Sequence, residues 1–228
     1  MRNRVVTSVV SGVVAVALGV TLAAQAPQGG AAAPAAPGPG GQGRGGGRGG
    51  GRGFNLPPLL METDAFPDGG IVPLKYANAG GSTMPAFKFS NAPAGTVAYA
   101  VIFHDIDVSL MGSTGDVLHW MAWDIPAASN GWPEGPNTGA SLPAGSVMGN
   151  NMTGKPVYMG PGAPAGPRYH HYVFELYALN ANLGLPATAT RDEVLKALEG
   201  KIVAKAAYVG RFRGEPAPAG AAPAGRGN

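Results

Sequence analysis

Hydrophobic side chains gather in short runs along the middle of the chain, and Gly, Asn or Pro bounds most of these runs. The continuous apolar stretch VAYAVIF is typical of a strand that is buried on both faces. A later, aromatic-rich run stops at Pro126, which cannot donate a ladder hydrogen bond. The runs that predict strands are Ile71–Tyr76, Ala86–Phe89, Val97–Phe103, His119–Ile125, Tyr172–Leu179 and Ala204–Phe212.

One helix is predicted late in the chain. Thr190 is followed three residues later by Glu193, which is the spacing of a capping box. Val194, Leu195 and Leu198 then share one apolar face, and Gly200 suits the left-handed position after a helix. Strands spread along the chain with one late helix predict a mainly antiparallel β domain.

Composition excludes several classes of site. The 228 residues include 38 Gly and 22 Pro but no Cys, and the net charge is +3. Without Cys there is no disulfide scaffold, no Cys-ligated zinc or iron–sulfur centre and no thiol nucleophile. The sequence also has no P-loop, dinucleotide-binding fingerprint or G-x-S-x-G elbow.

The positive charge lies outside the middle of the chain. Residues 1–53 carry five Arg and no acid, whereas residues 54–214 carry 10 Lys or Arg against 12 Asp or Glu. The middle therefore has a net charge of −2, and general attraction to nucleic acid explains its binding poorly. Any anion that it binds must be held by a few local donors.

The N-terminus predicts export. Residues 1–26 have two Arg at the start, the apolar run Val5–Ala24 and small residues near Ala26, as in a signal peptide. A run of 20 residues could also span a bilayer if it stayed uncut, which would be the chain's one contact with a membrane. We favour the cleaved signal and a periplasmic or secreted bacterial protein.

Three further segments follow the signal. Residues 27–53 are expected to be a disordered Gly/Ala/Pro/Arg linker, 54–214 the folded domain and 215–228 a disordered tail. An Arg/Gly segment that binds anionic polymers is the alternative for 27–53. The long Gly/Pro/Asn-rich connection at 127–166 is expected to carry functional loops.

The four His of the chain lie beside predicted strands. His104 follows VAYAVIF, His119 opens HWMAWDI, and His170 with His171 opens YVFELYAL. Because polar residues at strand ends sit where loops meet the sheet, these groups could converge on one pocket. Any one of them alone is more often a hydrogen-bonded structural residue.

Two Asp follow His104. In a strand-like D-x-D, Asp105 and Asp107 would point the same way. Two neighbouring carboxylates need a cation, a proton or hydrogen-bond donors around them.

The order of short motifs resembles the phosphatidylethanolamine-binding protein family, in its bacterial Raf-kinase-inhibitor-like branch. The resemblance covers roughly Phe66 to Phe212. The matching stretches are FPDGGIVPLKY at 66–76, MPAFKF at 84–89, NAPAGT at 91–96, DID at 105–107, HW at 119–120, IP at 125–126, YMGP at 158–161, HHYVF at 170–174 and YAL at 177–179.

This resemblance implies an antiparallel β-sandwich-like fold with one or two short peripheral helices near the C-terminus. It also implies a small anion pocket at one end. Imidazole N–H groups, a Tyr hydroxyl and loop amides could hold a phosphate or carboxylate there. The implied ligand-binding residues are Asp105, Asp107, His119, Gly160, Pro161, His170 and Tyr172.

The sequence departs from the family pattern twice. The motif Asp-Pro-Asp-Ala-Pro has become Asp105-Ile-Asp-Val-Ser109, without the prolines that stiffen the rim. The motif His-Arg-Tyr has become His170-His171-Tyr172, and Arg168 could partly replace the lost charge.

The sequence thus predicts a non-enzymatic protein that binds a small anion, such as phosphate or a phospholipid headgroup, without metal or cofactor. A protein partner such as a kinase or protease, and a homodimer, remain open. The alternative is a metal-dependent hydrolase whose ligands are His104, Asp105, Asp107, His119, His170 and His171. Against it, the sequence has no H-x-x-x-H motif and no evident general-base Glu.

Overall fold

The computed structural model describes residues 58–112 and 114–216, which form two β-sheets and one α-helix. The predicted signal at 1–26, the linker at 27–53 and positions 217–228 of the predicted tail lie outside the described residues.

The larger sheet has six strands in the order β2-β9-β8-β4-β5-β7. All neighbours are antiparallel except β2 and β9, which pair in parallel. The most extensive pairing joins β8 and β9, from His170 opposite Phe212 to Leu179 opposite Ile202. The strand bounds are β2 Gly70–Ile71, β4 Ala98–Asp105, β5 Val117–Pro126, β7 Val147–Met148, β8 His170–Leu179 and β9 Ile202–Phe212.

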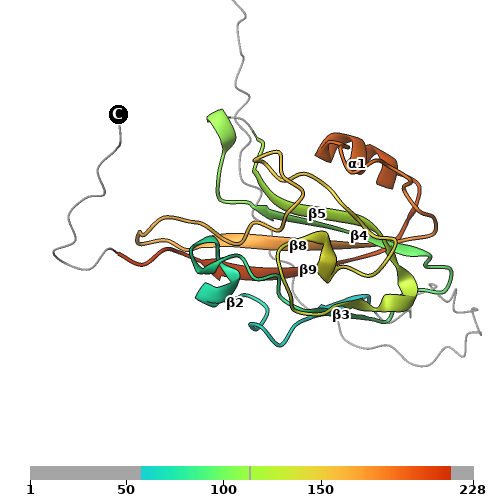
Figure 1. Cartoon of the computed structure of the whole chain (residues 1–228), viewed down its shortest axis with the longest axis horizontal. Coiled ribbons are helices and arrows are strands. Elements are labelled where there is room, and N and C mark those ends of the chain that lie inside the picture. Colours follow the sequence, from blue (N-terminus) through green and yellow to red (C-terminus); the bar gives the residue numbers. More distant parts are fainter. Residues whose placement is uncertain (1–57, 113, 217–228) are drawn as a thin grey trace, which may run out of the picture. The chain divides into compact units, whose positions relative to one another are not determined.

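A smaller sheet covers one face of the larger one (Figure 1). It consists of β1 (Leu60–Glu62), β3 (Phe87–Ser90) and β6 (Gly131–Trp132). Aromatic rings fill the space between the sheets. Phe87 of β3 lies with its ring centroid 4.8 Å from that of Phe174 on β8, and Phe103 of β4 stacks on Phe174 at 3.9 Å.

The helix α1 (Arg191–Leu198) lies on the opposite face of the larger sheet (Figure 1). Thr190 and Glu193 form the expected capping box, with the backbone N–H of Thr190 donating to Glu193 Oε2 at 2.7 Å. Val194 and Leu198 are buried in a second hydrophobic cluster. Gly200 has a φ of +75°, as expected for the residue that follows a helix end.

Strand β4 contributes to both cores because successive side chains alternate between the faces. Val101 and Phe103 belong to the core between the sheets, whereas Ala100 and Ile102 belong to the cluster under α1. This confirms the prediction of a strand buried on both faces. The same alternation places the next two residues, His104 and Asp105, on opposite faces.

The structure confirms a mainly β fold with one short helix near the C-terminus. The predicted strand at 71–76 is wrong beyond Ile71, because Pro73 cannot donate to a ladder and a 3-10 helix follows at Leu74–Tyr76. Within the described residues, no helix is long and apolar enough to cross a membrane. The described part of the chain has four other 3-10 turns, at Asn78–Gly80, Leu110–Gly112, Ala127–Ser129 and Gly139–Ser141.

Candidate functional site

A β-bulge directs His119 toward the core between the sheets. Phe103 pairs with Trp120 and His104 pairs with Leu118, so His119 is an extra residue on β5. Because of this extra residue, Trp120 and His119 both face the space between the sheets. Regular alternation would instead turn His119 toward α1.

The ring of His119 is held in one orientation. Its Nδ1 donates a hydrogen bond of 2.9 Å to the carbonyl oxygen of Met159, which fixes the proton on Nδ1 in the neutral ring. The ring also packs edge-on against Tyr172, with 5.1 Å between centroids. This leaves Nε2 as the nitrogen that is available to a ligand.

Asp105 and His170 form a buried pair at the ends of β4 and β8. His170 Nδ1 donates to Asp105 Oδ2 at 2.8 Å, and the backbone N–H of Asp107 donates to Asp105 Oδ1 at 3.0 Å. Only 3% of Asp105 is exposed, yet both of its carboxylate oxygens have a donor. The carboxylate therefore orients the imidazole of His170 and leaves the Nε2 of that ring for another partner.

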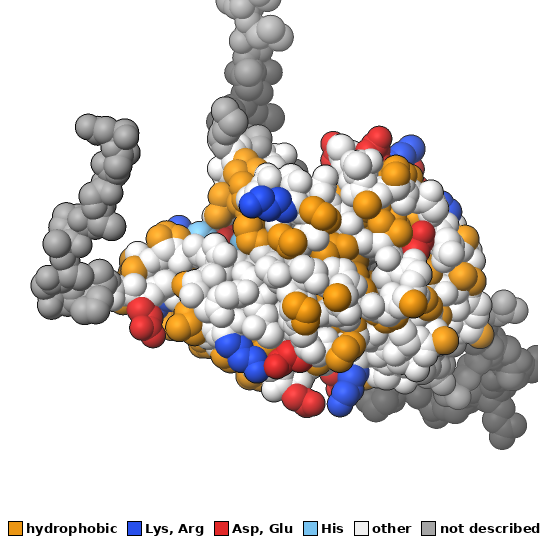
Figure 2. All heavy atoms as spheres, in the orientation of Figure 1, with side chains coloured by type: hydrophobic (Ala, Val, Ile, Leu, Met, Phe, Trp, Pro, Cys, Tyr) orange, Lys and Arg blue, Asp and Glu red, His pale blue; other side chains and the backbone are white. Residues whose placement is uncertain are grey.

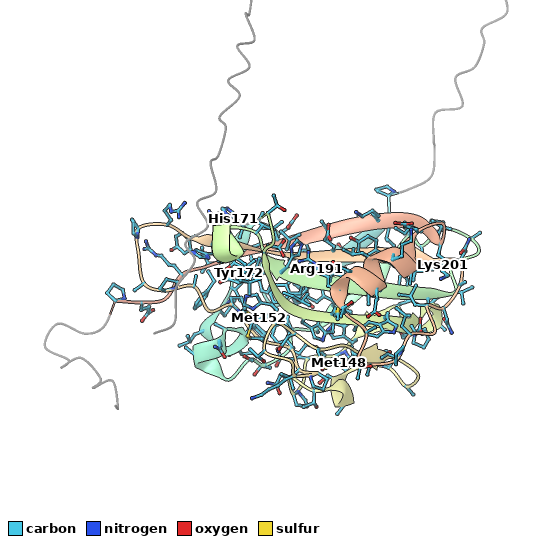
Figure 3. All side chains as sticks on the ribbon, turned by 90° about the horizontal axis from the view of Figure 1, so that it is seen from above. Met148, Met152, His171, Tyr172, Arg191 and Lys201 are labelled. Atoms are coloured by element: carbon cyan, nitrogen blue, oxygen red, sulfur yellow. The ribbon has the colours of Figure 1, made fainter. Side chains whose placement is uncertain are left out.

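Tyr172 of β8 lies between the two imidazoles and is fully buried. Its hydroxyl oxygen accepts from the backbone N–H groups of Gly162 and Ala163, at 3.2 and 2.9 Å. Burial, together with the negative charge of Asp105, raises the pKa of Tyr172. The hydroxyl thus stays protonated near neutral pH, and its hydrogen bond to the Asp105 carboxylate favours the same form. Figure 3 shows Tyr172 next to His171 on β8.

The loop after Met159 packs too closely for a side chain at Gly160. A Cβ at Gly160 would overlap the carbonyl oxygen of Tyr76, so only glycine fits. The N–H of Gly160 donates to Ser82 Oγ at 3.0 Å. The amides of Gly160, Gly162 and Ala163 therefore have partners within the protein and are not free donors for an anion, in contrast to the sequence-based expectation.

These groups enclose a cavity of about 230 Å³, called the small pocket below. Its polar side chains are those of Asn78, Asp105, His119, His170 and Tyr172, and Gly160 and Gly162 lie in its wall. Burial lowers the pKa of His119 below its usual 6.5, although the Met159 carbonyl and the charge of Asp105 act in the other direction. The pocket thus brings two ring nitrogens and one hydroxyl together without a free carboxylate oxygen.

The family model described as "Phosphatidylethanolamine-binding protein" matches residues 62–213. The chain belongs to this family. A UPF0098 protein of Methanothermobacter thermautotrophicus is 35% identical over 153 residues, covering 67% of this chain and 97% of the relative. LppC of Mycobacterium tuberculosis, named as a candidate lipoprotein, is 32% identical over 157 residues, covering 69% and 73%.

The fold is shared with solved members of the phosphatidylethanolamine-binding protein (PEBP) family. The crystal structure of YbcL from E. coli, described as a member of the mammalian PEBP family, superposes with a TM-score of 0.63 at 25% identity. The match covers 69% of this chain and 99% of YbcL. Together with the UPF0098 relatives, it places the chain in the YbcL-type branch.

Two residues of the predicted PEBP site lie outside the small pocket. β4 ends at Asp105, and Asp107 turns away to accept from the backbone N–H and Nδ1 of His171, at 2.6 and 2.9 Å. Partial burial acts to raise the pKa of Asp107, but these hydrogen bonds outweigh it and hold the pKa low. Pro161 lines a neighbouring cavity instead. The expected common direction of Asp105 and Asp107 is wrong, because the strand ends between them.

His104 lies on the far side of the larger sheet, in a group of charges here called the closed cluster: His104, Asp116, Glu175 and Arg191. His104 Nδ1 donates to Asp116 Oδ2 at 2.5 Å. Arg191, labelled at the start of α1 in Figure 3, forms an ion pair with the same carboxylate. His104 Nε2 lies 3.8 Å from Glu175 Oε2. Burial tends to raise the pKa of Asp116, but Arg191 and His104 keep it below its usual value.

The six groups considered as metal ligands thus separate into three places: the small pocket, the closed cluster and the Asp107–His171 pair. Among the described residues, no group of three or more His, Cys, Asp or Glu is placed to hold a metal ion. The six residues therefore do not form the single ligand set that the hydrolase alternative assumed.

Sequence reasoning missed several residues beside the pocket. Ser82 and Met159 hold the loop and His119, and Tyr169 and Arg213 line the neighbouring cavity. Tyr169 directly precedes the His170-His171-Tyr172 motif, and Arg213 directly follows the last predicted strand. These adjacent positions in the sequence were the one signal that could have identified Tyr169 and Arg213.

Proposed function

We propose that this PEBP-family chain is a non-enzymatic binding protein whose small pocket holds a small anion, such as phosphate or a phospholipid headgroup. The observation that carries the proposal is the set of polar groups at one cavity: the Nε2 atoms of His119 and His170, which donate when their rings are protonated, and the hydroxyl of Tyr172. Charge-assisted hydrogen bonds from such groups are the stronger ones that proteins make to anions.

The surroundings of these donors support anion binding. Asp105 would repel an anion if its carboxylate were bare, but both of its oxygens already accept hydrogen bonds. The walls exclude water on the core side, where Phe103 packs against His119 at 5.5 Å between centroids. An anion in this setting is held by local donors and not by net charge, since the domain is slightly acidic.

Titration of the purified full chain with inorganic phosphate and with phosphoethanolamine tests the proposal. We expect His119→Ala to weaken binding about 10- to 100-fold, because a hydrogen bond to a charged group contributes about 1.5–3 kcal/mol. His171→Ala is the matched control, since His171 lies on the same strand but outside the pocket. Equal phosphate binding by wild type and His119→Ala would sink the assignment.

The face of the domain in Figure 2 shows no large patch of basic side chains, which is the feature that nucleic-acid binding needs. On the face in Figure 2, hydrophobic side chains are scattered over the domain and charged ones are few. A protein partner, such as a kinase or protease whose activity the bound form changes, extends the proposal. Capture of one defined partner that depends on His119 would support that extension.

We also propose that the protein is exported to the periplasm or beyond. The support is the signal-like pattern of residues 1–26 and a relative, LppC, named as a candidate lipoprotein. Cell fractionation, with mass spectrometry of the mature N-terminus, tests this. Full-length protein found only in the cytoplasm would contradict it.

A further inference from the structure

A second and larger cavity of about 690 Å³ adjoins the small pocket. The two cavities share Asn78, Gly162 and Ala163 in their walls, so they meet at the loop that follows Gly160. The volume falls within the range of roughly 300–1,000 Å³ that is typical of small-molecule pockets. The small pocket, by contrast, has space for little more than the anionic group itself.

The larger cavity is a built feature of the chain's C-terminal segment. The backbone N–H of Gly214 donates to the carbonyl oxygen of Ala163 at 2.8 Å, which ties the end of the domain to the loop. Arg213 lies over the ring of Tyr169, 4.6 Å from its centroid, and its Nη1 donates to Gly166 O at 3.1 Å. These contacts hold two walls of the cavity in place.

The third wall is apolar and faces solvent. Ile71 and Leu74 line the cavity and are 46% and 57% exposed, although both are large hydrophobic residues. Phe212 and Pro161 add further apolar surface. Leaving such side chains in water forgoes the free energy of burial, which an apolar ligand group in the cavity would recover.

We propose that the larger cavity holds the apolar part of the same ligand whose anionic group occupies the small pocket. The inference rests on the proposed function. The ligand class is an anion, phosphate or carboxylate, that carries an alkyl or aromatic substituent. Gly162 lies where the two parts would join, and without a side chain it leaves that passage open: even a Cβ there would approach only Asn78, at 3.7 Å.

Ile71 and Leu74 then determine specificity, while the donors of the small pocket supply binding of the anionic group. Affinity should therefore rise with the length of the substituent, and the rise should depend on these two side chains. Since full burial of each CH₂ strengthens binding about fourfold, partial burial of a hexyl chain should give about a tenfold gain.

Calorimetric titration of the full chain with methyl, butyl and hexyl phosphate tests this. We expect hexyl phosphate to bind wild type about tenfold more tightly than methyl phosphate. In the double variant Ile71→Thr/Leu74→Ser the gain should fall below about threefold, with methyl phosphate binding unchanged. Leu195→Ser is the control, because Leu195 is 39% exposed on α1, on the other face of the sheet.

A flat series in wild type, or the same gain in the double variant, would overturn the proposal while phosphate binding dependent on His119 still stood. Loss of all His119-dependent binding would instead contradict the proposed function. Vesicles of phosphatidylglycerol distinguish the sources of the ligand. Binding of hexyl phosphate alone assigns a free amphiphile, and binding of both assigns a lipid. Vesicle binding without dependence on Ile71 and Leu74 counts against the cavity.

Discussion

The small pocket and the closed cluster lie on opposite faces of one sheet, begin at successive residues and use the same side-chain types. Asp105 opens the first, where it pairs with His170; His104 opens the second, where it pairs with Asp116. In the closed cluster, α1 brings Arg191 onto the shared carboxylate. In the small pocket the space beyond the imidazoles is a cavity.

The difference lies in what completes each pair. Asp116 accepts on both oxygens, from His104 on Oδ2 and from Arg191 on Oδ1, so the closed cluster ties α1 to β4 and the start of β5. The small pocket satisfies its carboxylate but leaves the Nε2 atoms of His119 and His170 facing a cavity. A His–Asp pair therefore indicates a binding site only where the second ring nitrogen of the His faces a cavity.

The largest expected effect separates the two regions by stability. Asp116→Ala leaves Arg191 and His104 without their anion, and loss of one partner of a buried pair costs about 3 kcal/mol. We expect that loss in the free energy of unfolding by urea, with phosphate affinity changed less than threefold. His119→Ala should do the reverse, and an Asp116→Ala variant as stable as wild type would show that the cluster does not hold α1.

A smaller effect depends on pH and is specific to the small pocket. The pKa of His119 in the folded, anion-free protein lies below 6.5. As the pH falls below 6.5, the unfolded chain therefore binds a proton at this residue more readily than the folded protein does, and the free energy of unfolding decreases. A bound anion favours the protonated ring. Sulfate does not titrate in this range. The stabilisation that it gives should therefore grow between pH 7.5 and 5.5 by about 1 kcal/mol, which corresponds to a rise of about 2–4 °C in the melting temperature.

The control for this measurement is His119→Ala, in which the sulfate effect should change much less with pH. A sulfate effect that is independent of pH in wild type, or that grows equally in both proteins, would contradict the role of His119.

The smallest effect is expected at the Asp107–His171 pair, which belongs to neither the small pocket nor the closed cluster. Asp107→Asn keeps an oxygen for the backbone N–H of His171 and loses only a half-exposed ion pair, which contributes about 0.5 kcal/mol. Urea unfolding and phosphate titration should both stay close to wild type. A tenfold loss of phosphate affinity in Asp107→Asn would show that Asp107 contributes to the binding site.

The elements that the sequence predicted well are those with local signals. The apolar composition of Val97–Phe103 is enough to predict β4. The capping box of Thr190 and Glu193, which predicts the start of α1, lies within four residues. The residues of the small pocket were predicted through family motifs, and the structure brings Asp105, His119, His170 and Tyr172 together. Their role in binding remains a prediction.

What could not be predicted depends on long-range geometry. The bulge that turns His119 inward is defined by pairing with β4, and no local pattern marks it. Arg191 meets Asp116 across 75 positions of sequence. The prediction that Asp105 and Asp107 point the same way required the strand to continue past Asp105. The strand ends at Asp105, and Asp107 lies in the turn that follows.

The strand order of the larger sheet has a consequence for synthesis. Strand β4 pairs with β8, and β2 pairs with β9. Two early strands can therefore complete their pairing only after the last part of the domain has been synthesised. A nascent chain that stops before His170 can pair β4 with β5 but cannot close the core between the sheets. Folding of the whole domain therefore follows completion of Phe212.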